Sequence, residues 1–205
     1  RMPCNRTDKT ADLWAWDGTV SASGSSFLLH AGEESVKCET KLLGAHNIQN
    51  ILLAASVCVH LGLTLKQIAR GVAKLTPVEH RLQLIPSAGG VTVIDDAFNS
   101  NPRGAQAALA VLGGFDGRRI IVTPGMVELG ENEADFNREL GKSMKGKADI
   151  AILVGKKHTQ PIHDGMTEAG FAEESIHAVA SLADATTLLQ SLSRPGDYVL
   201  FENDL

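Results

Sequence analysis

Two adjacent carboxylates and three amide or hydroxyl side chains follow an apolar segment in the middle of the chain. Val91–Ile94 is a short β-branched run of the kind found in buried strands. The polar residues after it are Asp95, Asp96, Asn99, Ser100 and Asn101. Pro102 then stands where a helix would begin, and ligands of open α/β sheets bind outside the carboxyl ends of the strands. The segment is therefore a candidate binding edge. The alternative is a polar loop in which Asn101 caps the helix.

Two further loops are expected at the same edge of the sheet. Thr123–Gly130 (TPGMVELG) follows an apolar strand and contributes Glu128, and Gly155–Thr159 (GKKHT) follows another and contributes Lys156. Carboxylates accept hydrogen bonds from ribose hydroxyls, and lysine or arginine neutralises phosphate oxygens. Together the loops indicate a nucleotide site, whereas each loop taken alone is better explained as a solvated turn.

A separate pair of amides lies near the start of a predicted helix. Asn47 and Asn50 are three residues apart, so they share a helix face and could present two amides to a planar ligand such as an adenine edge. The alternative is a helix cap and a solvent-facing amide. His46 beside them has no second ligand at metal-binding spacing. Arg81, which follows a predicted linker, could reach ligand phosphates or could lie on the surface.

The elements that must position these residues fall into two regions. Residues 1–43 predict short antiparallel strands, and two amphipathic helices follow, the second over Leu65–Leu75. A boundary near Val78–His80 separates a domain of residues 1–79 from one of residues 80–205. In the second domain apolar strands alternate with helices, which predicts the α/β class with a mostly parallel sheet covered by helices on both faces. The expected strands are 81–86, 91–94, 119–123, 150–154, 176–179 and 198–201, with helices after 102 and over 133–145, 159–169 and 182–192.

Bulk composition excludes several classes of function. The net charge of −5 over 205 residues gives no support to a nucleic-acid partner or an anionic membrane surface. No apolar run approaches the roughly 20 residues of a membrane helix. The three cysteines are widely spaced, which favours a reduced compartment without structural zinc, and Cys58 is expected in the core. The phosphate-loop pattern GxxxxGK[ST] is absent from these residues.

Four segments together resemble the Mur ligase family of ATP-dependent amide-bond ligases. They are GAHNIQN (44–50), PVEHRL (77–82), VIDDAFNSNP (93–102) and VTPGMVELGE (122–131). In the second segment His80 replaces the usual family glycine, and in the third Arg103 departs from the small or acidic residue common after NP, which leaves its role open. The last two segments are similar to the branch that adds D-Ala-D-Ala to UDP-MurNAc-tripeptide. The resemblance covers nearly all of residues 44–205.

The resemblance implies a three-domain parent enzyme of peptidoglycan synthesis. Residues 1–79 would be the last part of its central ATPase domain, and residues 80–205 most of its Rossmann-like C-terminal domain. The parent would be a cytoplasmic monomer that uses ATP and Mg²⁺ to join UDP-MurNAc-tripeptide and D-Ala-D-Ala through an acyl phosphate. The phosphate loop and most of the metal ligands would lie outside this chain, so the chain is expected to be a fragment that is inactive alone.

The resemblance also carries roles onto individual residues. Asn47 and Asn50 would contact adenine, Arg81 the ATP phosphates or ribose, and Asp96 the ribose hydroxyls. The expected neighbours of the incoming dipeptide are Asn99, Ser100 and Asn101, and the further candidates are His46, Asp95, Glu128 and Lys156. Two alternatives stay open: a Mur ligase that adds a single amino acid, and a non-enzymatic nucleotide-binding module.

Overall fold

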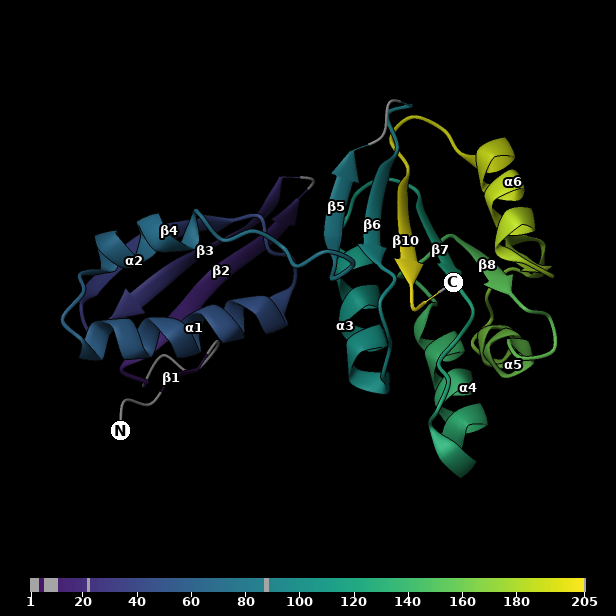
Figure 1. The fold of residues 1–205 in the computed structure, drawn as a ribbon, viewed down its shortest axis with the longest axis horizontal. Coiled ribbons are helices and arrows are strands. Elements are labelled where there is room, and N and C mark those ends of the chain that lie inside the picture. Colours follow the sequence, from purple (N-terminus) through teal and green to yellow (C-terminus); the bar gives the residue numbers. More distant parts are fainter. Residues whose placement is uncertain (1–3, 6–10, 22, 87–88, 205) are drawn as a thin grey trace. The chain divides into compact units, whose positions relative to one another are not determined.

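The computed structural model describes residues 4–5, 11–21, 23–86 and 89–204 (Figure 1). The chain divides into two compact units, Arg1–Pro77 and Val78–Leu205. This division falls two residues before the boundary expected between residues 79 and 80.

The first unit is a small sheet with two helices. Its strands, in the order in which they neighbour one another, are β1 (Cys4–Asn5), β2 (Leu13–Ser21), β3 (Gly24–Ala31) and β4 (Glu34–Thr40). β2, β3 and β4 pair antiparallel as predicted, and the short β1 pairs parallel with β2. The core forms where Leu13, Phe27 and Leu29 of the sheet meet Leu52 and Ile68 of the helices. Cys58, expected in the core, is half-buried and packs against the edge of this cluster.

Both helices of this unit follow from local sequence. α1 (Ala45–His60) buries Ile48, Ile51, Leu52 and Ala55, which recur with helical spacing on one face. α2 (Leu65–Val72) starts at a capping box, in which Thr64 and Gln67 exchange side-chain and backbone hydrogen bonds. The prediction that this helix extends to Leu75 is wrong. After Val72 the backbone continues in i→i+3 bonds, which tighten the last turn instead of adding another α-turn.

The second unit is a six-stranded sheet with the strand order β5-β6-β10-β7-β8-β9. β5 is antiparallel to β6, and every other neighbouring pair is parallel, which confirms the predicted mostly parallel α/β fold. The strands are β5 (Gln83–Pro86), β6 (Thr92–Asp96), β7 (Arg119–Thr123), β8 (Ile150–Val154), β9 (Ile176–Val179) and β10 (Tyr198–Glu202). Figure 1 shows β10, the last strand of the chain, lying between β6 and β7.

Four α-helices connect and cover these strands. They are α3 (Pro102–Leu112), α4 (Glu133–Ser143), α5 (Gln160–Glu168) and α6 (Leu182–Leu192), with short 3₁₀ turns at Gly130–Asn132 and Glu173–Ser175. Ala185 of α6 joins Ile120, Val122, Ile152 and Val199 in one apolar cluster, so α6 covers the sheet face to which these alternate strand residues point. α3 contacts β10 and α4.

α4 and α5 pack with their backbones unusually close. A Cβ atom added at Gly141 would lie 2.1 Å from the Ile162 carbonyl oxygen, and one added at Gly165 would lie 2.0 Å from the Arg138 carbonyl oxygen. Both distances are far inside van der Waals contact, so no larger residue fits at either position. α4 follows the loop after β7, and α5 follows the loop after β8.

Candidate functional site

The carboxyl ends of four parallel strands meet at one edge of the second sheet. β6, β10, β7 and β8 are consecutive neighbours, and Glu202 of β10 is in register with Asp96 of β6. On the other side of β10, Phe201 is in register with Val122, so Thr123 lies beside Glu202. The loops after β6, β7 and β8 therefore leave the same edge. The loop after β8 is three strand spacings from β6, or about 14 Å.

The two adjacent aspartates hold the segment that leads into β5. Asp95 Oδ2 lies 2.8 Å from His80 Nδ1, and Asp96 Oδ1 accepts a 3.0 Å hydrogen bond from the Leu82 backbone N–H. His80 and Leu82 adopt left-handed backbone angles, with φ of 58° and 47°, which residues with a Cβ adopt at a cost. The aspartates therefore stabilise a turn that places Arg81 at this edge, and a glycine at position 80 would adopt the same angle without strain.

Arg81 meets the loop that follows β6. Its Nη1 donates to the Asn99 carbonyl oxygen at 3.4 Å, and its guanidinium carbon lies 4.3 Å from the centre of the Phe98 ring. Arg81 and Asn99 are exposed, as is Phe98, whose side chain keeps 55% of its surface accessible. The arrangement is a cation–π contact at the surface with a charged group held beside an exposed loop. It brings together two predicted site residues, Arg81 and Asn99.

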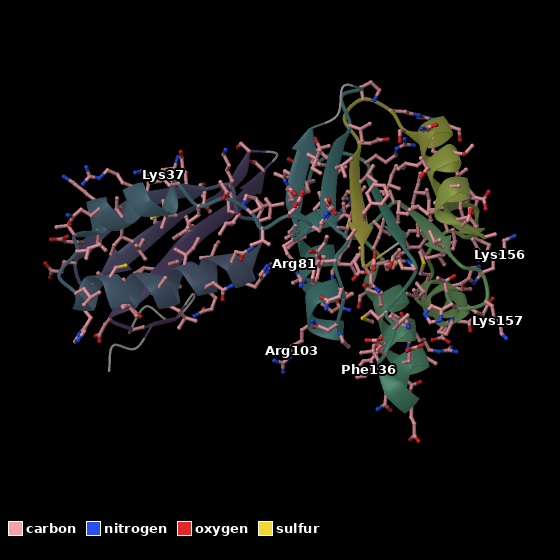
Figure 2. The ribbon with its side chains drawn as sticks, in the orientation of Figure 1. Lys37, Arg81, Arg103, Phe136, Lys156 and Lys157 are labelled. Carbon is pink, nitrogen blue, oxygen red and sulfur yellow. The ribbon has the colours of Figure 1, made fainter. Side chains whose placement is uncertain are left out.

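Ser100 and Asn101 have structural partners. The Asn101 side chain accepts hydrogen bonds from the backbone N–H groups of Arg103 and Gly104, at 3.1 and 2.9 Å, and so caps α3. This is the alternative that the sequence left open for Asn101. The Ser100 hydroxyl donates to Glu202 Oε1. Arg103 is exposed and points outward from α3 (Figure 2).

Glu202 and Asn203 belong to this edge, and sequence reasoning missed both. Glu202 is 1% exposed, and its Oε2 accepts a 2.8 Å hydrogen bond from Thr123 Oγ1. Burial raises the pKa of Glu202, the hydrogen bonds from Ser100 and Thr123 lower it, and the nearby charge of Asp96 raises it further, so that the net shift is upward. Asn203, at φ of 69°, donates from Nδ2 to the Gly125 carbonyl oxygen at 2.6 Å. The available signal was a carboxylate directly after the apolar run YVLF.

A further buried polar residue outside the prediction, Asn137, holds the loop after β7. Asn137 of α4 is 1% exposed, and its Oδ1 accepts from the Met126 N–H at 2.8 Å. Its Nδ2 donates to the carbonyl oxygens of Met126 and Glu133, at 2.8 and 3.1 Å. The Asn137 side-chain amide thus binds both backbone polar groups of Met126, as a neighbouring strand would. The loop after β7 is a fixed part of the edge.

Lys156 lies apart from the groups around Arg81, and the roles of Glu128 and Lys156 stay predictions. Both are exposed. Figure 2 shows Arg81 on the β5–β6 side of this unit and Lys156 on the opposite side, near α5 and α6. The order of the strands accounts for this separation, because β10 and β7 stand between β6 and β8.

The remaining predicted residues lie on α1 of the first unit. Asn47 Nδ2 donates to the Leu43 carbonyl oxygen at 2.8 Å, while His46 and Asn50 are exposed. Gly44, and not an asparagine, is the N-cap residue of the helix. The joint action of these amides with Arg81 and Asp96 stays a prediction.

Neither a metal cluster nor a membrane-spanning helix occurs among the residues that the structure describes. Within residues 4–5, 11–21, 23–86 and 89–204, no group of three or more His, Cys, Asp or Glu side chains is arranged to hold a metal ion. Among the helices of these same residues, none combines the length and the apolar character that crossing a membrane requires.

The fold and this edge define a class of protein. The profile described as Mur ligase, glutamate ligase domain, matches residues 80–202, and the chain belongs to the Mur ligase family. Its relatives include the UDP-N-acetylmuramoyl-tripeptide–D-alanyl-D-alanine ligase of Mycobacterium tuberculosis (strain ATCC 25618 / H37Rv). The two are 31% identical over 217 residues, which cover 94% of this chain and 42% of the relative. The chain thus spans less than half the length of that ligase.

Solved structures agree on the fold. MurF from Acinetobacter baumannii superposes with a TM-score of 0.80 at 24% identity, covering 99% of this chain and 43% of that one. MurF from Thermotoga maritima, solved in complex with ADP, superposes with a TM-score of 0.79 at 21% identity, covering 96% and 44%. The resemblance to the Mur ligases that the sequence motifs indicated is confirmed.

Proposed function

We propose that this chain is part of an ATP-dependent ligase of peptidoglycan synthesis that joins D-Ala-D-Ala to UDP-MurNAc-tripeptide in the cytoplasm. The observation that carries the proposal is the 31% identity, over 94% of the chain, to a ligase named for that reaction. The motifs VIDDAFNSNP and VTPGMVELGE lie at the sheet edge where ligands of such folds bind.

In this reaction ATP supplies the phosphoryl group that activates the carboxylate of the tripeptide, and the amine of D-Ala-D-Ala displaces it. The second unit supplies positioning for these steps. The exposed cation of Arg81 fits a phosphate group, because its guanidinium is fixed by Phe98 and by the Asn99 carbonyl at the edge of the sheet. Asp96 is assigned to the ribose and the amides of Asn47 and Asn50 to adenine. The Mg²⁺ ligands are assigned to the part of the parent enzyme outside this chain.

The contacts of the loop after β6 refine the assignment of its three polar residues. Ser100 and Asn101 are engaged with Glu202 and with the start of α3, whereas the Asn99 side chain is exposed. We therefore assign contact with the incoming dipeptide to Asn99. Ser100 and Asn101 act by fixing the shape of the loop.

The test uses the full-length parent enzyme, purified with its upstream domains. ADP release is measured with UDP-MurNAc-tripeptide and either D-Ala-D-Ala or single amino acids. The proposal expects turnover with the dipeptide, and a strong preference for one amino acid would support the second type of Mur ligase instead. No ADP release with any acceptor, in an enzyme that binds nucleotide, would favour the non-enzymatic module.

Substitution of Asn99 by alanine then tests the assignment within the loop. It is expected to raise the KM for D-Ala-D-Ala about 10-fold, the effect of losing one good hydrogen bond to the substrate. Gln106→Ala, in the middle of α3, is a control in the same part of the chain, because Gln106 bonds to Ser143 and not to the edge. Equal KM values for the two variants would refute the role of Asn99.

A further inference from the structure

Glu202 is a buried carboxyl group at the centre of the candidate edge that none of the proposed steps uses. It ends β10, the strand between β6 and β7, and 1% of its surface is exposed. Burying a carboxyl group is costly unless its oxygens are hydrogen-bonded. The two residues before it on β10, Leu200 and Phe201, are apolar, so Glu202 is the first charged residue at this end of the strand.

The two oxygens of Glu202 bind two different loops. Ser100, on the loop after β6, donates to Oε1, and Thr123, at the end of β7, donates to Oε2 at 2.8 Å. Thr123 Oγ1 in turn accepts a 3.0 Å hydrogen bond from the Gly125 N–H. The chain of contacts thus runs from the loop that carries Asn99 through Glu202 to the loop after β7. Asn203 extends it, since its Nδ2 binds the Gly125 carbonyl oxygen.

We propose that Glu202 is a positioning residue, whose carboxyl group fixes the Ala97–Asn101 loop against the end of β7 and so sets the place of Asn99 for the incoming substrate. The functional part rests on the proposed function, and the structural part does not. The residue acts through Ser100 and is not assigned any contact with substrate. A glutamine at position 202 can keep the anchor. Its side-chain oxygen can accept the hydrogen bond from Thr123, and its nitrogen can donate to the Ser100 hydroxyl, which then accepts instead of donating.

The chain contains a matched control for this carboxyl group. Asp197 lies directly before β10, at the opposite end of the strand, and is 3% exposed. It accepts hydrogen bonds from the Arg118 side chain and from the Arg194 backbone N–H. Substituting either residue by alanine therefore removes a buried, hydrogen-bonded carboxyl group at one end of β10. Only Glu202 touches the candidate edge.

The first experiment measures amide hydrogen exchange by NMR in the 205-residue chain. E202A is expected to speed exchange of the Gly125 amide and of the Ala97–Asn101 amides about 10-fold or more, because one anchor of about 1.4 kcal/mol is lost. E202Q is expected to stay within about 3-fold of the wild type. S100A, a milder change in a half-exposed loop, should affect the Ala97–Asn101 amides and spare Gly125. Unchanged exchange in folded E202A or in S100A would overturn the proposal, as would equal effects in D197A.

The second experiment measures ligation in the full-length enzyme. E202A is expected to raise the KM for D-Ala-D-Ala about 10-fold while kcat changes less than about 3-fold, and E202Q is expected to restore the wild-type KM. D197A should lower stability and leave this KM unchanged. The same rise in KM with D197A would show a merely structural effect and refute the proposal. If the enzyme does not use D-Ala-D-Ala at all, the proposed function fails, while the exchange comparison still decides whether Glu202 anchors the loop.

Discussion

Replacing Asn137 by alanine tests whether one buried amide holds the loop after β7 in place. The substitution removes the partners of the Met126 N–H and carbonyl groups, both buried and each 2.8 Å from the amide. The Glu133 carbonyl oxygen also loses its 3.1 Å hydrogen bond from Asn137. It lies in the first turn of α4, where it can still accept a hydrogen bond of the helix, so we count no cost for it. Each buried group left unpaired costs about 1–3 kcal/mol, so the loss of stability is about 4 kcal/mol. At about 3 °C per kcal/mol, the melting temperature of the second unit should fall by about 12 °C.

The measurement needs signals that separate the two units. Both tryptophans, Trp14 and Trp16, belong to the first unit, so their fluorescence follows that unit, whereas far-ultraviolet circular dichroism follows both. The N137A variant is expected to shift the circular dichroism transition and to leave the tryptophan transition in place. Asn132→Ala is the control, because Asn132 is exposed and its side chain makes no cap hydrogen bond. A shift in N137A below about 2 °C, or no larger than that in N132A, would refute the reasoning.

Three further predictions follow from other parts of the structure. G165A should destabilise the second unit by about 3 kcal/mol or prevent its folding, because the new Cβ would lie 2.0 Å from the Arg138 carbonyl oxygen. G104A, in α3 of the same unit, is the control in urea denaturation, because its new Cβ would lie 3.5 Å from the nearest heavy atom, an ordinary contact. Burial raises the pKa of Glu202 above 4.5, so its contribution to stability is complete below that value and is lost as the pH rises through the folded pKa. The free energy of unfolding of E202Q minus that of the wild type should therefore increase from about pH 4.5 upward. Urea denaturation at several pH values measures this difference, and a difference that stays constant with pH would contradict the prediction. The chain alone should bind ATP with a dissociation constant in the high micromolar range or above, weakened further by R81A. A low-micromolar value by calorimetry would contradict the assignment of most phosphate contacts to a phosphate loop outside this chain.

Much of the fold follows from local patterns in the sequence. Arg119–Thr123, Ile150–Val154, Ile176–Val179 and Leu182–Leu192 have the predicted bounds. These segments are short apolar runs or an amphipathic helix between turn residues, so neighbouring side chains alone define their ends. The end of α2 was predicted three residues too late, because apolar spacing continues to Leu75 while the backbone has already left the α-helical pattern.

The candidate site was predicted less completely than the fold. Arg81 contacts the Asn99 carbonyl oxygen at the predicted edge, while their roles in binding stay predictions. Lys156 was grouped with them because it follows a strand, but a strand end specifies an edge and not a distance along it, and the roles of Lys156 and Glu128 stay predictions. Asn137 was missed because an asparagine in the middle of a helix gives no local signal that it is buried.

By itself, the sequence determined the family, the α/β class and the polar residues at the strand ends, because periodicity and short motifs record local burial and local chemistry. The tertiary structure alone decided which strands are neighbours. Inserting β10 between β6 and β7 brought Glu202 to Ser100, 102 residues earlier in the chain. The pairing of β5 with the other side of β6 placed Asp95 and Asp96 beside the turn around Arg81, which they hold by hydrogen bonds. Pairing between distant strands depends on how the whole core packs, and no local window of the sequence contains that information.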